Sequence, residues 1–290
     1  MDRMESCFVE MDGLRIHYLT DRAPAGMAAP DRPPVLLLHG GGTDSAHLSW
    51  ALTIPALAQA GLRVFAPDWP GFGQSDYPDA PYSLDYYVGL LPRLLDALGI
   101  ERASLVGISM GGGVALGCAL RYPQRVVRLV PVDSYGLQTR VPYPWLSALM
   151  VRLPWINEIT RAWMARSRAM TAWALRAIFA DPSHATPELV DEAWAEVRRP
   201  GAGRAWRAFQ RYEAGWSRVR TSYLEELGQI NAPVLLVHGA RDTLVPLKWA
   251  QEAQRRLPNA CLEVLPDCGH WAQREQPDVF NRLVVAFLTE

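Results

Sequence analysis

The sequence predicts an α/β protein, with a mostly parallel sheet flanked by helices and a helical insertion late in the chain. The 290 residues are 49% hydrophobic and 20% charged, which excludes a disordered chain and a coiled coil. Short apolar runs alternate with amphipathic helical segments, the pattern of right-handed βαβ units. The alternation stops once and then resumes. These three observations define the predicted fold class.

The elements before the interruption follow in order. Asp12-Gly13 predicts a hairpin within residues 7–19, because glycine takes a positive φ at low cost. Residues 35–39 form a continuous apolar run, which is typical of a strand buried on both faces. Further strands are expected at 62–66, 104–106 and 126–131, and helices at 51–59, 84–98 and 110–121.

The interruption runs from about residue 134 to about residue 225 and shows helical patterns only. They lie at 155–179, 187–198 and 204–216. Strands then return at 233–238 and 261–265, and helices at 249–257 and 277–288. The predicted domains are an α/β core, formed by residues 1–133 and 226–290, and a helical cap at 134–225.

The composition of the predicted cap is unusual. It holds seven of the eleven tryptophans, thirteen arginines and eight acidic residues, so its net charge is 13 − 8 = +5. The arginines are expected mainly on solvated helix faces, with contact to an anionic substrate as the lesser alternative. The tryptophans are expected to line an apolar, aromatic pocket.

Charge and cysteine content exclude several classes of function. Lys plus Arg is 29 and Asp plus Glu is 30, so nothing favours a nucleic-acid partner. No stretch has the length of a signal peptide or a membrane span, and the four cysteines lack metal-ligand spacing. We therefore expect a cytoplasmic protein with no metal, no cofactor and no membrane partner. The oligomeric state stays open, a homo-oligomer included.

Residues 107–111 form a G-x-S-x-G sequence directly after a predicted strand and at the start of a helix. Such a turn lifts the serine hydroxyl clear of the sheet, and glycines flank it because side chains would clash. Ser109 is therefore the candidate nucleophile. A plain glycine-rich turn is the alternative.

A serine nucleophile needs a base near neutral pKa and a group that orients this base. Of six histidines, only His270 follows the last predicted strand. Asp242 follows the strand before it, so the order is Ser109, Asp242, His270, the order of α/β-hydrolases. Asp133, just past strand 126–131, is the rival acid. Both acids are expected at the carboxyl edge of the sheet, where ligands bind.

The oxyanion formed on a carbonyl needs fixed donors. The backbone N–H of Met110 is one candidate, because it begins the helix after Ser109. The second comes from the HGGG run at 39–42, whose backbone can approach a substrate. A flexible glycine turn is the alternative for this run. Gly42, Ile108 and Trp271 are expected to contact the substrate.

Taken together, these motifs resemble the α/β-hydrolase superfamily, in particular its serine-nucleophile esterases. The resemblance includes residues 39–42, 68–75, 107–111, 239–242 and 269–270. It implies the α/β-hydrolase fold, a triad of Ser109, Asp242 and His270, and oxyanion donors Gly41 and Met110. Aspartate-nucleophile dehalogenases and epoxide hydrolases are disfavoured, since position 109 is serine.

Residues 268–273 and 280–283 are similar to meta-cleavage-product C–C hydrolases. Those enzymes carry an asparagine where this chain has Ile108, and a substrate-binding arginine where the nearest alignment gives Ala193. We therefore expect a cofactor-free serine hydrolase of small to medium apolar carboxylic esters. C–C hydrolysis of a 2-hydroxy-6-oxo-dienoate is the alternative. A catalytically silent ligand receptor is a third hypothesis, disfavoured by the intact triad.

Overall fold

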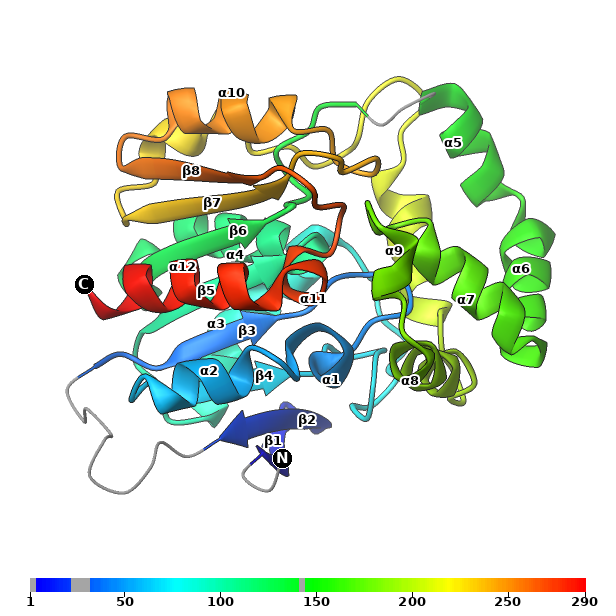
Figure 1. Ribbon diagram of the computed structural model, residues 1–290, viewed down its shortest axis with the longest axis horizontal. Coiled ribbons are helices and arrows are strands. Elements are labelled where there is room, and N and C mark those ends of the chain that lie inside the picture. Colours follow the sequence, from blue (N-terminus) through cyan, green and yellow to red (C-terminus); the bar gives the residue numbers. More distant parts are fainter. Residues whose placement is uncertain (1–3, 22–31, 141–143) are drawn as a thin grey trace.

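The computed structural model describes residues 4–21, 32–140 and 144–290, and a central eight-stranded sheet organises them (Figure 1). The strands are β1 (Met4–Met11), β2 (Leu14–Asp21), β3 (Val35–Leu38), β4 (Val64–Pro67), β5 (Ala103–Ile108), β6 (Val126–Val132), β7 (Val234–Gly239) and β8 (Ala260–Leu265). They are ordered β1-β2-β4-β3-β5-β6-β7-β8. The six strands from β4 to β8 in this order run parallel. Strand β2 pairs antiparallel with β4, and β1 pairs antiparallel with β2. The predicted α/β fold class is confirmed.

The N-terminal hairpin forms at the expected turn. Asp12 has φ 53° and Gly13 has φ 77°, and Met11 pairs with Leu14 across them. Two successive positive φ values match the twist of the flanking strands, which explains the Asp-Gly sequence. The hairpin then joins the sheet through antiparallel pairing of β2 with β4.

Helices cover both faces of the sheet (Figure 1). The helices of the core are α1 (Ala46–Trp50), α2 (Ile54–Gln59), α3 (Leu84–Ala97), α4 (Met110–Arg121), α10 (Lys248–Arg256), α11 (Ala272–Glu275) and α12 (Pro277–Thr289). Side chains of α3, α4 and α10 pack in one apolar cluster, and those of α1, α2 and α12 pack in the other. β5 is buried along its whole length between them, as its uniform apolar sequence predicts. Within the described ranges, no helix could cross a membrane.

Five helices lie between β6 and β7 and stand beyond the carboxyl ends of the parallel strands (Figure 1). They are α5 (Pro144–Arg152), α6 (Pro154–Arg166), α7 (Arg168–Arg176), α8 (Pro187–Val197) and α9 (Arg204–Glu213). The helical insertion was therefore predicted at the right place in the chain. Helix α5 was not expected.

Two boundaries within these helices differ from expectation. The helix expected over 155–179 is divided at Ser167, whose extended backbone ends α6 and whose Oγ accepts the Met170 N–H that begins α7. The helix expected to reach Trp216 stops at Glu213, because Ala214 turns extended and forms an isolated bridge with Val219.

Glu213 joins the inserted helices to the core. Its buried carboxylate accepts hydrogen bonds from the backbone N–H of Leu84 at 3.0 Å, the Tyr135 hydroxyl at 3.2 Å and the Thr221 N–H at 3.1 Å. Burial, with the Glu213 carboxylate as second cause, raises the pKa of Tyr135 well above its ordinary value, so this hydroxyl retains the proton it donates. One carboxylate therefore links α9 to the start of α3 and to the segment after β6.

This linkage predicts a large stability effect. Glu213→Ala leaves several buried donors without their acceptor, and we expect the free energy of unfolding to fall by about 3 kcal/mol in urea denaturation. Glu226→Ala is the matched control: Glu226 is exposed, and its variant should remain within about 0.5 kcal/mol of wild type. A Glu213→Ala variant as stable as this control would contradict the assignment.

Candidate active site

Ser109 lies on the sharp turn between β5 and α4. Its φ of 51° and ψ of −115° are strained values for a residue with a side chain. The flanking glycines are required by close packing: a Cβ at Gly107 would meet the Gly111 carbonyl oxygen at 2.3 Å, and one at Gly111 would meet the Leu38 oxygen at 2.2 Å. The turn therefore holds the geometry expected of a nucleophile elbow.

Asp242 and His270 lie together although 28 residues separate them. His270 Nδ1 is 2.8 Å from Asp242 Oδ2. The other Asp242 oxygen accepts backbone N–H groups of Leu244 at 2.7 Å and Val245 at 3.0 Å. The carboxylate is thus fixed by its own loop, and it orients the imidazole so that Nε2 is the free nitrogen.

The backbone beside His270 is held by the insertion. The His270 N–H donates to the Ile178 carbonyl, which lies just after α7, at 2.8 Å. A Cβ at Gly269 would meet that same carbonyl oxygen at 2.4 Å, so glycine is needed for this approach. The inserted helices therefore help to position the candidate base.

Asp133, the rival acid, is close by but bonded elsewhere. It has φ 41° at the end of β6, is fully buried, and accepts the Gly239 N–H at 2.8 Å. Burial first, and the nearby Asp242 carboxylate second, raise the pKa of Asp133 well above its ordinary value. Burial therefore disfavours the charged form of Asp133, and its carboxyl group bonds to the Gly239 backbone and not to His270.

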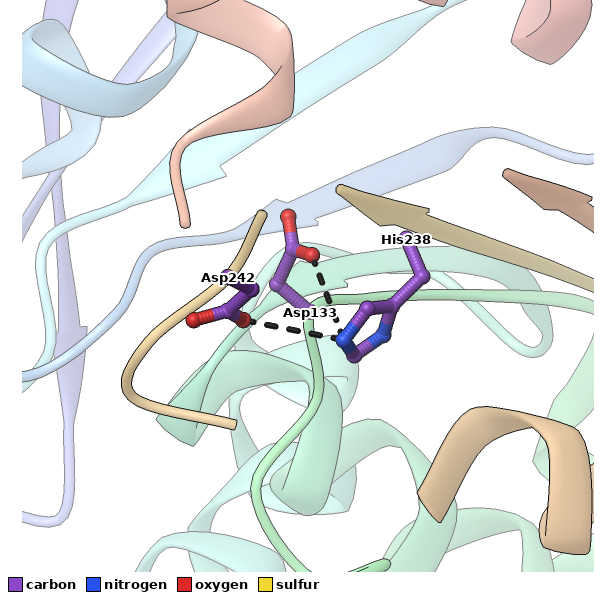
Figure 2. Close-up of side chains that lie close together, drawn as sticks. All are labelled: Asp133, His238 and Asp242. Carbon is purple, nitrogen blue, oxygen red and sulfur yellow. Dashed lines mark ion pairs between the residues drawn. The ribbon is translucent and has the colours of Figure 1, made fainter. Parts of the chain in front are cut away.

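His238 Nε2 faces both acids and lies 3.7 Å from Asp133 Oδ1 and 3.7 Å from Asp242 Oδ2 (Figure 2). The donor atoms of the three residues lie within 4.8 Å of one another, a spacing that a metal ion could use. The geometry does not fit one, because His238 Nε2 lies 2.8 Å from the Val245 carbonyl and must carry the proton donated there. Burial also lowers the pKa of His238, which keeps it neutral. These residues form a structural network behind the site.

The glycine run after β3 is fixed by a residue that sequence analysis missed. Asp44 is buried, and its carboxylate accepts the Gly40 N–H at 2.7 Å, the Ser45 N–H at 2.8 Å and the Ser49 hydroxyl. Gly41 lies against Trp206 of α9, since a Cβ there would fall 2.1 Å from the indole ring. An aspartate two residues after the glycine run was the only signal for this support.

A cavity of about 700 Å³ joins these parts between the sheet edge and the inserted helices. Six of the predicted site residues line it: Gly41, Gly42, Ile108, Ser109, His270 and Trp271. Asp242 lies behind His270, and the Met110 side chain is buried in the core, so its expected contribution is its backbone N–H alone. Ala193 also lines the cavity. Among the described lining residues there is no arginine or lysine.

The expectation that the tryptophans of residues 134–225 line the pocket is wrong for most of them. Four are exposed to solvent: Trp145 at 63%, Trp163 at 60%, Trp173 at 67% and Trp216 at 56%. Trp194 instead donates to the Ala165 carbonyl at 3.2 Å. Of those with described side chains, only Trp206 lines the cavity. Composition reports how many large aromatics a segment holds, whereas helix orientation decides which face carries them.

Replacing Asp242 and replacing Asp133 are expected to have very different effects on the reactivity of Ser109. Asp242→Asn removes the acceptor of the His270 proton, and we expect fluorophosphonate labelling of Ser109 to slow by roughly two to four orders of magnitude. Asp133→Asn is nearly isosteric and keeps an oxygen for the Gly239 N–H, so this variant should label within about threefold of wild type. Exchanged results would place the orienting acid after β6.

The comparisons with known proteins agree with this geometry. The chain matches the alpha/beta hydrolase fold family over residues 33–277. It is 34% identical over 261 residues to the 2-hydroxymuconate semialdehyde hydrolase of Pseudomonas sp. (strain CF600), covering 89% of this chain and 87% of that protein. It is 33% identical over 263 residues to the 2-hydroxy-6-oxo-6-phenylhexa-2,4-dienoate hydrolase of Burkholderia cepacia, covering 88% and 87%.

A solved structure is also similar over nearly the whole chain. The meta-cleavage product hydrolase from Pseudomonas fluorescens IP01 superposes with a TM-score of 0.80 at 32% identity, covering 98% of this chain and 97% of that one. The prediction of carboxylic ester cleavage is wrong on this basis, because the relatives are named for semialdehyde and dienoate substrates. The departures at Ile108 and Ala193 are therefore compatible with close similarity to dienoate hydrolases over almost nine-tenths of the chain. The chain belongs to the α/β-hydrolase fold family, and it is a hydrolase.

Proposed function

We propose that this protein is a serine hydrolase that cleaves a C–C bond in a 2-hydroxy-6-oxo-dienoate, a meta-cleavage product. The main support is the similarity to dienoate hydrolases over almost nine-tenths of the chain. Within the site, Ser109 and His270 line one cavity, and Asp242 holds His270. The segment 134–225 acts as a cap, since its helices supply part of the cavity wall.

The proposed reaction follows from the positions of Ser109, His270 and the oxyanion donors around the cavity. His270 takes the proton of Ser109 as its Oγ adds to the C6 carbonyl of the substrate. The N–H groups of Gly41 and Met110 receive the resulting oxyanion. The C5–C6 bond breaks in the keto tautomer, which forms when the proton of the 2-hydroxyl group moves to C5. The electron pair of the broken bond is delocalised from C5 to the C2 carbonyl oxygen, which gives a dienolate.

The protons and the acyl group balance without a cofactor. The imidazolium of His270 gives its proton to the C2 oxygen of this dienolate, which releases 2-hydroxypenta-2,4-dienoate. Water, deprotonated by His270, hydrolyses the acyl group from Ser109 and leaves a carboxylic acid. The net reaction consumes one water for each C–C bond broken.

The test uses 2-hydroxy-6-oxo-6-phenylhexa-2,4-dienoate. Wild type should convert it to benzoate and 2-hydroxypenta-2,4-dienoate in equal amounts, followed by loss of the coloured dienolate and by chromatography. Ser109→Ala should lower kcat by roughly three to six orders of magnitude, because the triad acts as a unit. Ser183→Ala, at an exposed serine, is the control and should match wild type. No benzoate from wild type, or full turnover by Ser109→Ala, would refute the proposal.

The cavity walls also predict which C6 substituent is accepted. Apolar residues such as Ile108, Leu175 and Phe209 line it, and its carboxyl groups belong to Asp44 and Glu213. A second carboxylate on the substrate would meet apolar surface and acids, and desolvation without a partner costs about 1–3 kcal/mol.

We therefore expect a higher kcat/KM for the 6-phenyl dienoate than for 2-hydroxy-6-oxononadienedioate, by about 10- to 100-fold. Steady-state kinetics on the two substrates measures this ratio. A relative at 34% identity is named for the dioate substrate, so the opposite preference is a real alternative. A higher kcat/KM for the dioate would contradict this description of the cavity walls.

A further inference from the structure

A second, smaller cavity of about 320 Å³ adjoins the one that contains Ser109. Six residues line both cavities: Gly42, Thr43, Asp44, Met164, Trp206 and Gln210. Trp206 therefore stands at the junction, with its ring against Gly41. A ligand that extends past Trp206 would reach from the reacting serine into the smaller cavity.

Arginine side chains line the smaller cavity, whereas the described residues that line the larger cavity include no arginine or lysine. Arg161 of α6 and Arg207 of α9 both line the smaller cavity. The two side chains approach each other at Gly203: a Cβ built there would lie 3.2 Å from Arg161 Cδ and 3.2 Å from Arg207 Nη1. A positive region thus faces this cavity from two different helices.

Arg161 has unused hydrogen-bonding capacity. Its Nε is buried and has no hydrogen-bond partner in the part of the chain that the structure describes. A buried N–H of a charged group is costly when unsatisfied, and a guanidinium matches the two oxygens of a carboxylate. A bound carboxylate would supply the acceptor that the protein does not.

The acids lining the smaller cavity are engaged with other groups. Asp44 accepts the N–H groups of its own loop. Glu196 forms an ion pair with Arg199, whose Nε lies 2.8 Å from the Glu196 carboxylate, and burial raises the pKa of Glu196. Among the residues that the structure describes, no hydrogen bond or ion pair joins either acid to Arg161.

We infer that the smaller cavity binds the C1 carboxylate of the substrate through Arg161, while the C6 carbonyl lies beside Ser109. This inference rests on the proposed function, since it places the acid end of the same dienoate. It also accounts for Ala193: the cation for the substrate carboxylate lies on α6 and not on α8. Arg161 is thus a specificity-determining residue.

The experiment measures binding separately from turnover. In a Ser109→Ala background, which binds without cleaving, the Kd of 2-hydroxy-6-oxo-6-phenylhexa-2,4-dienoate is measured by calorimetry with and without Arg161→Gln. The expected increase in Kd is about 10- to 100-fold, the range for losing a hydrogen-bonded charge pair. Arg161→Lys should recover part of the affinity, because it restores the charge but not the planar fork.

Two controls separate charge recognition from a change in cavity shape. Arg166→Gln, at an exposed arginine of the same helix, should leave the Kd within twofold. The C1 carboxamide of the same compound carries no charge, so Arg161→Gln should change its Kd by less than threefold. Thermal melts check that each variant is folded.

The outcomes separate this inference from the proposed function. An unchanged Kd, or an equal loss for acid and amide, overturns the carboxylate site even if wild type cleaves the dienoate. Arg161-dependent binding in a protein whose wild type produces no benzoate keeps the site and refutes the C–C hydrolase. Failure of Ser109→Ala to bind the dienoate at all overturns both.

Discussion

The close packing of backbone around Ser109 is the constraint on which the rest of the site depends. Gly107 and Gly111 let β5, α4 and the end of β3 approach to distances that no side chain would allow. The Ser109 N–H donates to the Val132 carbonyl at 2.9 Å, and its own carbonyl accepts the Tyr135 N–H at 3.0 Å. The strained turn is thus held by the neighbouring strands, and the energy of folding the sheet maintains it.

Two aspartates at the carboxyl edge of the sheet have different hydrogen-bond partners and therefore different roles. Asp133 and Asp242 both follow parallel strands, and both lie 3.7 Å from His238. Asp133 accepts a hydrogen bond from the backbone of Gly239, and burial raises its pKa, whereas Asp242 reaches His270. Two charged carboxylates in one buried network would repel each other, and the Asp242 carboxylate is accordingly the second cause, after burial, that raises the pKa of Asp133.

The inserted helices complete the site in addition to covering it. The Ile178 carbonyl holds the backbone of His270, Trp206 packs on Gly41, and Glu213 bonds to the start of α3. Each of these contacts joins a helix of the insertion to a loop of the core. The division into a larger apolar cavity and a smaller one with arginines follows from where Trp206 stands.

The sequence by itself determined the features whose requirements are local. The Asp-Gly hairpin, the buried strands and the G-x-S-x-G turn each follow from steric and burial demands within a few residues, and the structure contains all three. The order of strands and helices was predictable for the same reason. The fold class and the place of the insertion followed from that order.

Only the tertiary structure decided which distant groups meet. Asp133 and Asp242 were equivalent as residues after strands, and the pairing with His270 depends on loops that converge in space. Asp44, Glu213 and Arg161 carried no motif, because a single charged residue in a sequence is most often solvated. Most tryptophans of residues 134–225 face solvent, since helix orientation depends on packing partners that lie elsewhere in the chain. Contacts between distant segments depend on the balance of burial and hydrogen bonding over the whole fold, and no local pattern records that balance.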